Sequence, residues 1–299
     1  MQGDIVSGVL LPLILAFIMF SLGLGLTVGD FRRIFTQPLA LLVGVVCHFV
    51  LLPLACFLLL SAWGMTGVFA VGFMILAACP TGSTSNLLTY LARGDVALAL
   101  SFTAVASVAT IFTLPLVVTW ALGHYLGAAR AVDVPVGLMM GQVAMVLGLP
   151  VSAGMWVRHR WSAWAQRFEP RATRVATVLF VLIVVLAVAK NWALLRDNFS
   201  TLAPFALLLN ISMLCVGFGV AWAARLSRSQ SVTLGIETAV QNAALALVIA
   251  STVLQDDAMA IPGALYGVLM YAGGLLFALA MRRLLPAAPT TATVATTAV

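Results

Sequence analysis

Nine long runs of apolar residues constrain this chain more than any other feature of its sequence. A helix needs roughly 20 apolar residues to cross the hydrocarbon core of a bilayer. The runs lie at residues 5–27, 37–61, 67–92, 95–122, 134–157, 172–192, 202–224, 231–254 and 261–281. They are too long and too continuous for barrel strands, and lipid cannot satisfy an open sheet edge. The pattern therefore predicts an all-α polytopic membrane protein with nine transmembrane helices.

Charged residues are too scarce for a soluble protein. They make up 8% of the chain, against roughly 25% in water-soluble domains, so lipid must cover most of the exterior. The net charge of +6 comes from basic residues dispersed between the apolar runs, and we expect no nucleic-acid partner. Cys47, Cys56, Cys79 and Cys215 lie inside apolar runs without metal-type spacing, so we interpret them as small core residues.

The distribution of basic residues predicts the orientation. With the N-terminus outside, only Arg130, Lys190 and Arg196 remain outside, as the positive-inside rule requires. The cytoplasmic set is Arg32, Arg33, Arg93, Arg158, Arg160, Arg167, Arg171, Arg174, Arg225, Arg228, Arg282 and Arg283. We expect an integral protein of a bacterial inner membrane with a cytoplasmic C-terminus. Residues 286–299, rich in Ala and Thr, are predicted to form a disordered tail.

Glu237 is the one carboxylate that falls well inside an apolar run, and an ionisable group in the membrane indicates a functional site. Polar residues or helix breakers interrupt two runs, at CPTGSTSN (79–86) and GIETAVQN (235–242). Backbone groups freed by such breaks persist in a membrane only where they line a cavity or bind something. An ion is the simplest partner for them.

The interrupted runs also correspond to each other in an internal repeat. Pairing spans 1 to 4 with spans 6 to 9 makes each partner cross the membrane in the opposite direction and makes the two broken runs equivalent. An inverted repeat with two discontinuous helices is typical of secondary transporters, which bind their substrates near the midplane.

The interrupted segments resemble the bile acid:sodium symporter family. Members carry CP-G-x-x-SN-x-x-TYLA-x-G-[ND]-VAL in one crossing helix and E-x-x-x-QN in the other; here the segments read CPTGSTSNLLTYLARGDVAL (79–98) and ETAVQN (237–242). The resemblance implies one transporter domain over residues 1–285. Its panel would comprise spans 5–27, 134–157 and 172–192, and its core spans 37–61, 67–92, 95–122, 202–224, 231–254 and 261–281. The two discontinuous helices would cross in the core.

The resemblance also implies site residues. One sodium site would use Ser85, Asn86, Thr103 and Glu237, and a second would use Glu237 and Gln241, with His48 at the position of a further ligand. The substrate would meet Ser83, Asn86, Asn242 and Tyr271. Oxygen ligands of this kind suit a hard cation such as sodium.

Three positions depart from the family pattern. Ala99 stands where the first site usually has a serine, and His48 stands where the second usually has a glutamine, so both one and two sodium ions stay open. His48 fits equally a neutral packed histidine and a proton-coupling group. Leu269, Met270 and Tyr271 replace a Trp-His-Asn sequence near the substrate, so the substrate is not specified.

These observations predict a sodium-coupled symporter of an amphipathic organic anion, such as a bile acid, a steroid conjugate or a pantoate-like acid, working by alternating access. Proton coupling through Glu237 and His48 is one alternative, and a sensor that binds its ligand without transport is another. The sequence holds no paired aspartates, H-E-x-x-H motif or serine with a placed base, so we expect no enzyme. We expect a monomer whose partners are sodium, the anion and the bilayer.

Overall fold

A computed structural model of the chain describes residues 9–127 and 135–284, and these are helical apart from short connections. The helices are α2 (Leu11–Gly25), α3 (Val28–Arg32), α4 (Pro38–Val46), α5 (Leu52–Trp63), α6 (Gly67–Ala78), α7 (Ser85–Leu91), α8 (Val96–Leu126), α10 (Val136–Val143), α11 (Leu149–Arg160), α12 (Ser162–Lys190), α13 (Trp192–Ala223), α14 (Arg228–Ala239), α15 (Ala243–Val248) and α16 (Ala260–Leu284). The prediction of an all-α protein is confirmed.

Within the described residues, six helices are long and apolar enough to cross a bilayer. They match six of the predicted runs and extend over Pro38–Trp63, Val96–Leu126, Val136–Arg160, Ser162–Lys190, Trp192–Ala223 and Ala260–Arg283. The other three runs give shorter helices: α2 in the first, α6 and α7 in the third, and α14 and α15 in the eighth. The tail predicted at 286–299 lies outside the described residues.

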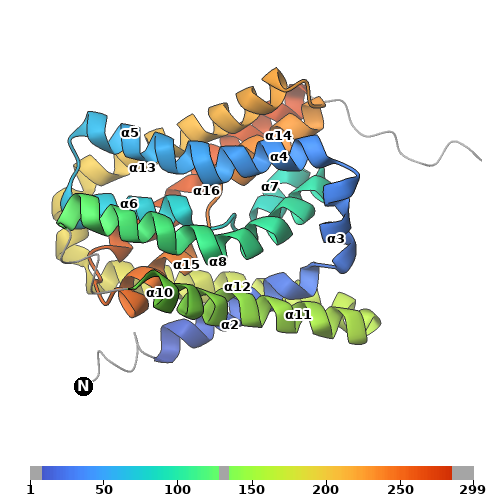
Figure 1. The fold of residues 1–299 in the computed structure, drawn as a ribbon, viewed down its shortest axis with the longest axis horizontal. Helices are drawn as coiled ribbons and strands as arrows, with labels where there is room; N and C mark the ends of the chain where they lie inside the picture. The colour runs from blue at the N-terminus through green and yellow to red at the C-terminus, as the bar shows by residue number, and fades with distance from the viewer. Residues whose placement is uncertain (1–8, 128–134, 285–299) are drawn as a thin grey trace, which may run out of the picture.

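Helices α2, α10, α11 and α12 form a layer below the other helices in Figure 1. Helices α2 and α11 pack with almost no space between their backbones: a Cβ atom on Gly154 would lie 2.3 Å from the carbonyl oxygen of Phe20. Glycine at such positions lets membrane helices approach closely, which maximises van der Waals contact where lipid weakens the hydrophobic drive to associate. Gly154 therefore allows the close packing of α2 against α11.

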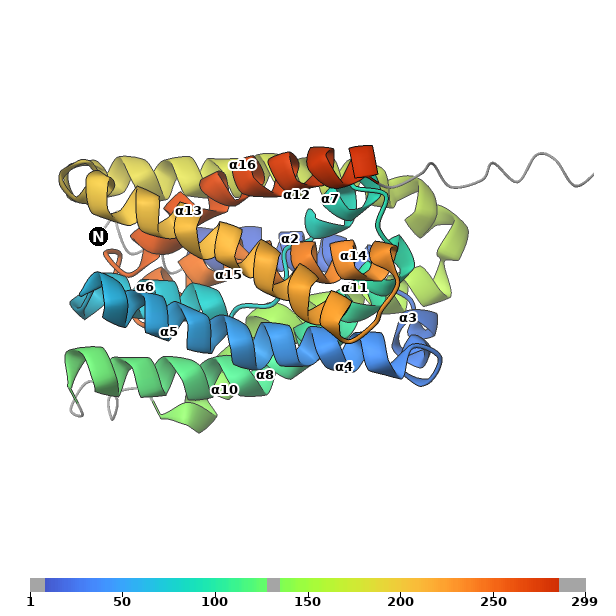
Figure 2. The ribbon, with the colours of Figure 1, turned by 90° about the horizontal axis from the view of Figure 1, so that it is seen from above.

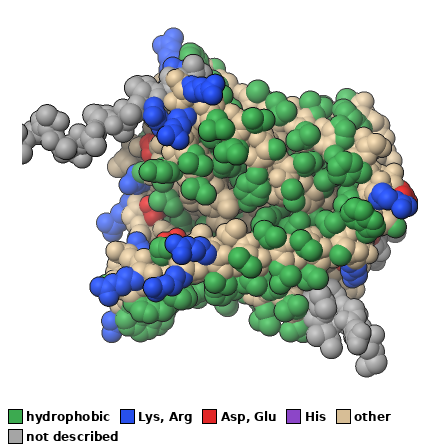
Figure 3. Space-filling view, turned by 180° about the vertical axis from the view of Figure 1, so that it is seen from behind, with side chains coloured by type: hydrophobic (Ala, Val, Ile, Leu, Met, Phe, Trp, Pro, Cys, Tyr) green, Lys and Arg blue, Asp and Glu red, His purple; other side chains and the backbone are tan. Residues whose placement is uncertain are grey.

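The surface carries a broad apolar area and basic residues gathered toward one end (Figure 3). Large side chains such as Leu42, Phe112, Val178 and Leu276 are exposed, which suits lipid and not water. Three cysteines are buried as predicted, but Cys215 is exposed, because it lies on an outward face of α13. The prediction that all four cysteines are core residues was wrong for Cys215.

The broken third and eighth runs meet at the centre of the molecule. Helices α6 and α15 lie on one side of the centre and α7 and α14 on the other, in both views of the ribbon (Figures 1 and 2). Pro80 explains the first break, because it has no N–H to continue the helix. At the end of α6, Cys79 N–H donates at 3.1 Å to the carbonyl of Leu76, which is three residues back and not four. The second break is stabilised by Asn242, whose side chain accepts from Leu245 N–H at 3.0 Å and caps α15.

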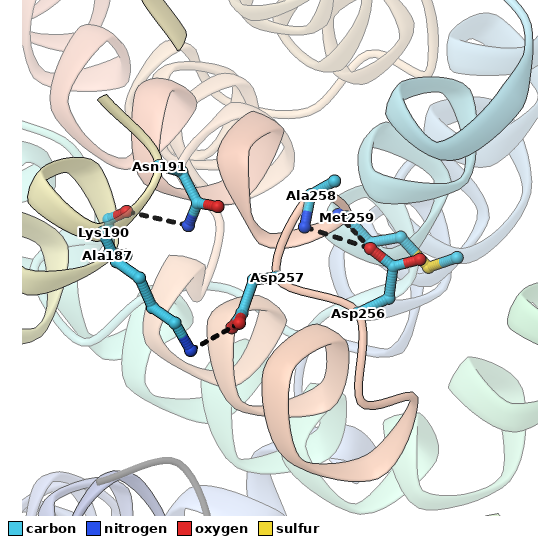
Figure 4. A network of polar contacts seen from close by, with 7 residues as sticks. All are labelled: Ala187, Lys190, Asn191, Asp256, Asp257, Ala258 and Met259. Atoms are coloured by element: carbon cyan, nitrogen blue, oxygen red, sulfur yellow. Dashed lines mark hydrogen bonds and ion pairs between the residues drawn. The ribbon is translucent and has the colours of Figure 1, made fainter. Parts of the chain in front are cut away.

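An ion pair joins the lower layer to the connection before α16 (Figure 4). Lys190 Nζ, at the end of α12, lies 2.5 Å from Asp257 Oδ2, with both side chains partly exposed. The neighbouring Asp256 accepts from Ala258 N–H at 3.0 Å and shapes the same turn. The pair therefore links two elements that could otherwise separate at this end.

Replacing Lys190 by glutamine is expected to lower the free energy of unfolding by at most about 1 kcal/mol, because exposed ion pairs are screened by water. Adding Asp257→Asn to Lys190→Gln should cause no further loss in the free energy of unfolding. A double-mutant cycle of thermal unfolding in detergent measures this. Arg196→Gln is the matched control, because Arg196 pairs with its neighbour Asp197 on the same helix. Additive losses from Lys190→Gln and Asp257→Asn would contradict a stabilising link.

Candidate functional site at the helix crossing

The two broken runs pair at the crossing through their extended segments. Thr81 and Gln241 form an isolated antiparallel bridge. Gly82 N–H donates to the Val240 carbonyl at 2.9 Å, and Asn242 N–H donates to the Pro80 carbonyl at 2.9 Å. The Thr81 hydroxyl also donates to the Val240 carbonyl, at 3.1 Å. Backbone groups that each helix gives up are thus satisfied by the other segment, as they must be away from water.

The approach is so close that position 82 requires glycine. A Cβ atom on Gly82 would lie 2.9 Å from the backbone oxygen of Gln241. A backbone carbonyl cannot move aside as a flexible side chain can, so the crossing is incompatible with any larger residue at position 82 unless the segments separate.

Glu237 lies beside this crossing and is fully buried. Thr103 Oγ1, from α8, donates to its Oε2 at 3.3 Å. The hydroxyls of Ser85 and Thr81 also face the carboxylate, although Ser85 does not reach hydrogen-bond geometry. No Lys or Arg among the described residues forms an ion pair with Glu237. A buried carboxylate that is surrounded by hydroxyl groups and is not paired with a Lys or Arg of the described residues is suited to bind a small cation.

Several buried oxygen atoms at the crossing have no hydrogen-bond partner in the part of the chain that the structure describes. They are Ser85 Oγ, Asn86 Oδ1, Glu237 Oε1 and Gln241 Oε1. A buried polar atom without a partner costs about 1–3 kcal/mol, so native proteins rarely leave several in one place. These four oxygens belong to residues that the family resemblance assigns to sodium, and oxygens are the ligands that hard cations prefer.

His48 contacts the crossing through both nitrogens of its ring. Nε2 lies 2.9 Å from the Cys79 carbonyl oxygen and Nδ1 lies 3.2 Å from the Glu237 carbonyl oxygen. The ring comes from a π-helical turn, Cys47–Leu51, ahead of Pro53, which has no N–H to offer the preceding turn. His48 therefore touches the backbone of Glu237, and no hydrogen bond joins it to the carboxylate.

The four residues assigned to the substrate divide between two cavities. Ser83, Asn242 and Tyr271 line one, next to Met19. Within it the Tyr271 and Thr84 hydroxyls are 3.0 Å apart. Asn242, besides capping α15, directs its Nδ2 at the Met19 sulfur at 3.6 Å.

The second cavity has a volume of about 370 Å³, and Ser83 and Asn86 line it. Arg158 and Glu169, from α11 and α12, also line it. No carboxylate among the described residues pairs with Arg158. The cavity thus combines polar groups from the crossing with a cation and a carboxylate from the lower layer.

Sequence reasoning missed two residues that support the crossing. Asn210 and Tyr266 are fully buried, and both donate to the Ala239 carbonyl, at 3.1 and 2.7 Å. Asn210 stands alone in the apolar stretch LLLNISML, and a search for every amide inside a run would have found it. Nothing in the sequence distinguishes Tyr266 from an ordinary membrane tyrosine.

Comparison with known proteins identifies the class of this arrangement. The model of the Sodium Bile acid symporter family matches residues 12–198, more than half of the chain. The chain belongs to this family. The resemblance found in the residues around the two breaks is therefore confirmed.

Individual relatives are similar over most of this chain. A probable chloroplastic sodium/metabolite cotransporter of Oryza sativa subsp. japonica is 29% identical over 91% of the chain and 66% of its own length. The ileal sodium/bile acid cotransporter of Homo sapiens is 28% identical over 84% of the chain and 70% of its length. The sodium-dependent organic anion transporter of Rattus norvegicus is 28% identical over 82% and 66%. The chain spans just under two thirds of the first of these relatives.

Proposed function

We propose that this protein is a symporter that couples sodium to the uptake of an organic anion. One observation carries the proposal: a fully buried carboxylate, Glu237, stands at the crossing of two broken helices beside buried oxygens that have no hydrogen-bond partner among the described residues. Sodium would bind to Ser85, Asn86, Thr103, Glu237 and Gln241, whose charge and oxygens match its needs. The names of the relatives, which include sodium/bile acid, sodium/metabolite and sodium-dependent organic anion carriers, support the same coupling.

The substrate would bind between the crossing and the lower layer. Ser83 and Asn86 would meet it from one side and Arg158 from the other, since a guanidinium binds carboxylates and sulfonates well. Asn242 and Tyr271 would meet the part of it that enters the neighbouring cavity. The bound sodium and Arg158 would supply positive charge for an anion, and Glu169 in the lining of the same cavity would offset part of it.

Alternating access would come from movement between the two layers. In this proposal spans 5–27, 134–157 and 172–192 form a panel and the other six form a core, giving nine spans in an inverted repeat. Paired broken helices in equivalent halves support such a repeat. The excess of arginine in alternate loops supports an N-terminus outside. Location in a bacterial inner membrane and a monomeric state stay predictions.

Uptake into proteoliposomes tests the proposal. Taurocholate and pantoate serve as probes, with an inward sodium gradient, an inward potassium gradient or an inward proton gradient at zero sodium. We expect accumulation only with sodium. Accumulation driven by protons alone would favour the alternative that uses Glu237 and His48. Saturable binding without accumulation under any gradient would favour a sensor.

Thr103→Val is expected to weaken sodium binding roughly tenfold, because valine keeps the shape but removes the hydroxyl that touches Glu237; a hydrogen bond to a charged group contributes about 1.5–3 kcal/mol. The sodium concentration at half-maximal uptake measures the change. Thr113→Val is the control, because the Thr113 hydroxyl only bonds back to its own helix, at the Ala109 carbonyl. Equal effects of the two substitutions would contradict a ligand role for Thr103.

A further inference from the structure

Two cavities of very different size adjoin beside the helix crossing. The larger has a volume of about 370 Å³ and the smaller a volume of about 40 Å³. Ile18, Ser83 and Ala176 line both, so the two spaces are neighbours. A water molecule needs roughly 10–15 Å³ of such space. The smaller cavity therefore holds a group of about two or three heavy atoms.

The charged groups are on the side of the larger cavity. Arg158 and Glu169 line that cavity, whereas no charged side chain of the described residues lines the smaller one. A carboxylate of the substrate would bind to Arg158, because a guanidinium matches the geometry of a carboxylate. The part of the same molecule that enters the smaller cavity would then be uncharged.

The smaller cavity offers hydrogen-bond donors to that uncharged part. Asn242 uses its Oδ1 to cap α15, which leaves Nδ2 as the group that it can offer. The hydroxyls of Thr84 and Tyr271 lie 3.0 Å apart, and whichever of them donates to the other, one hydroxyl hydrogen stays available. Donors that line so small a space suit a single accepting oxygen, such as that of a hydroxyl or a carbonyl group.

Met19 fills the place of such an acceptor. Its sulfur lies 3.6 Å from Asn242 Nδ2, and the residue, on α2, is only 1% exposed. A thioether is a weak acceptor on a flexible side chain, so an oxygen of the substrate can replace it on Nδ2 at little cost. Because Met19 also lines the smaller cavity, its bulk limits what can enter there.

We infer that Met19 is a specificity-determining residue that restricts the substrate to carboxylates whose far end is a small uncharged oxygen group, such as a hydroxymethyl group. The inference rests on the proposed function and specifies the shape of its substrate. The carboxylate binds to Arg158, and the oxygen at the far end accepts from Asn242 in the smaller cavity. A bulkier far end collides with the Met19 side chain.

Three forms of one probe test this selectivity in the wild-type protein. They are pantoate, which ends in a hydroxymethyl group, its analogue without that hydroxyl, and its propyl ether at the same oxygen. At saturating sodium, the analogue should bind roughly two- to tenfold more weakly than pantoate, the usual effect of losing a neutral hydrogen bond. The ether should bind at least about fivefold more weakly, because its added atoms overpack the cavity.

Met19→Ala tests the role of the side chain. The substitution removes as many heavy atoms as the propyl group adds, so this variant should bind the ether as tightly as it binds pantoate. Met19→Leu keeps nearly the same volume and should discriminate against the ether as the wild type does. Met213→Ala is the matched control, because Met213 in α13 is equally buried but lines neither cavity. It should leave the ratio of the two affinities unchanged.

The outcomes separate this inference from the proposed function. The inference is overturned, and sodium coupling stands, if the wild type binds the ether as well as pantoate or if Met19→Ala keeps the wild-type ratio. Sodium-driven uptake of taurocholate without any binding of pantoate has the same meaning. Both ideas fail if no anion is bound or taken up in a sodium-dependent manner. If Met19→Ala does not fold, the wild-type affinities and those of Met19→Leu still decide.

Discussion

Glu237→Gln is expected to abolish sodium-dependent uptake while the protein stays folded. Glutamine has the same shape as glutamate but removes the buried negative charge of Glu237 at the crossing. Two unit charges about 4 Å apart interact with about 4 kcal/mol at an effective dielectric constant of 20. Loss of that energy corresponds to roughly a thousandfold weaker sodium binding. Initial rates of uptake over a range of sodium concentrations measure the effect.

Asp197→Asn is the control for the loss of a carboxylate, because Asp197 is exposed and pairs with its neighbour Arg196 in α13. It should leave the sodium dependence unchanged. Thermal unfolding of both variants separates a binding defect from a folding defect. Wild-type sodium affinity in Glu237→Gln would remove the central claim, because the charge of Glu237 would then have no part in coupling.

Gly82→Ala is expected to reduce uptake at least tenfold and to lower stability by about 1–3 kcal/mol, the usual cost of overpacking. The added methyl group would lie 2.9 Å from the Gln241 backbone oxygen. The two segments must then separate, which stretches the bond from Gly82 N–H to the Val240 carbonyl and moves Gln241 away from Glu237. Uptake rates and thermal unfolding in detergent measure the two effects.

Gly141→Ala is the matched control, because a methyl group at Gly141 in α10 meets no other atom within 4 Å. It should be neutral or slightly stabilising, since alanine favours a helix more than glycine does. If Gly82→Ala also behaves as wild type, the crossing tolerates separation, and the close approach of its segments is not needed for transport.

The membrane class, the helical fold and the positions of both breaks could be predicted from local features of the sequence. A run of apolar residues determines a spanning helix by its length, and a missing N–H at Pro80 interrupts a helix whatever surrounds it. Glu237 stood out for an equally local reason, since it is a carboxylate in an apolar run. The family resemblance drew on the same two stretches.

Predicted ligands proved harder to assign to roles. Asn242 was expected to face the substrate, and it does line a cavity, yet its side chain also caps α15 and touches Met19. Asn210 escaped notice because one amide in an apolar run looks like many that tie helices together. Its role is to donate a hydrogen bond to the carbonyl of Ala239, which lies 29 residues away in the sequence.

The sequence by itself determined which segments form apolar helices, where two of them break and which carboxylate lies beside the breaks, because length, hydropathy and a missing backbone donor act locally. Only the tertiary structure decided what the breaks bind. His48 reaches carbonyls 31 and 189 residues away, and Thr81 reaches one 159 residues away. Those partners are chosen by how the helices pack, since a freed carbonyl bonds whichever donor the fold brings within about 3 Å.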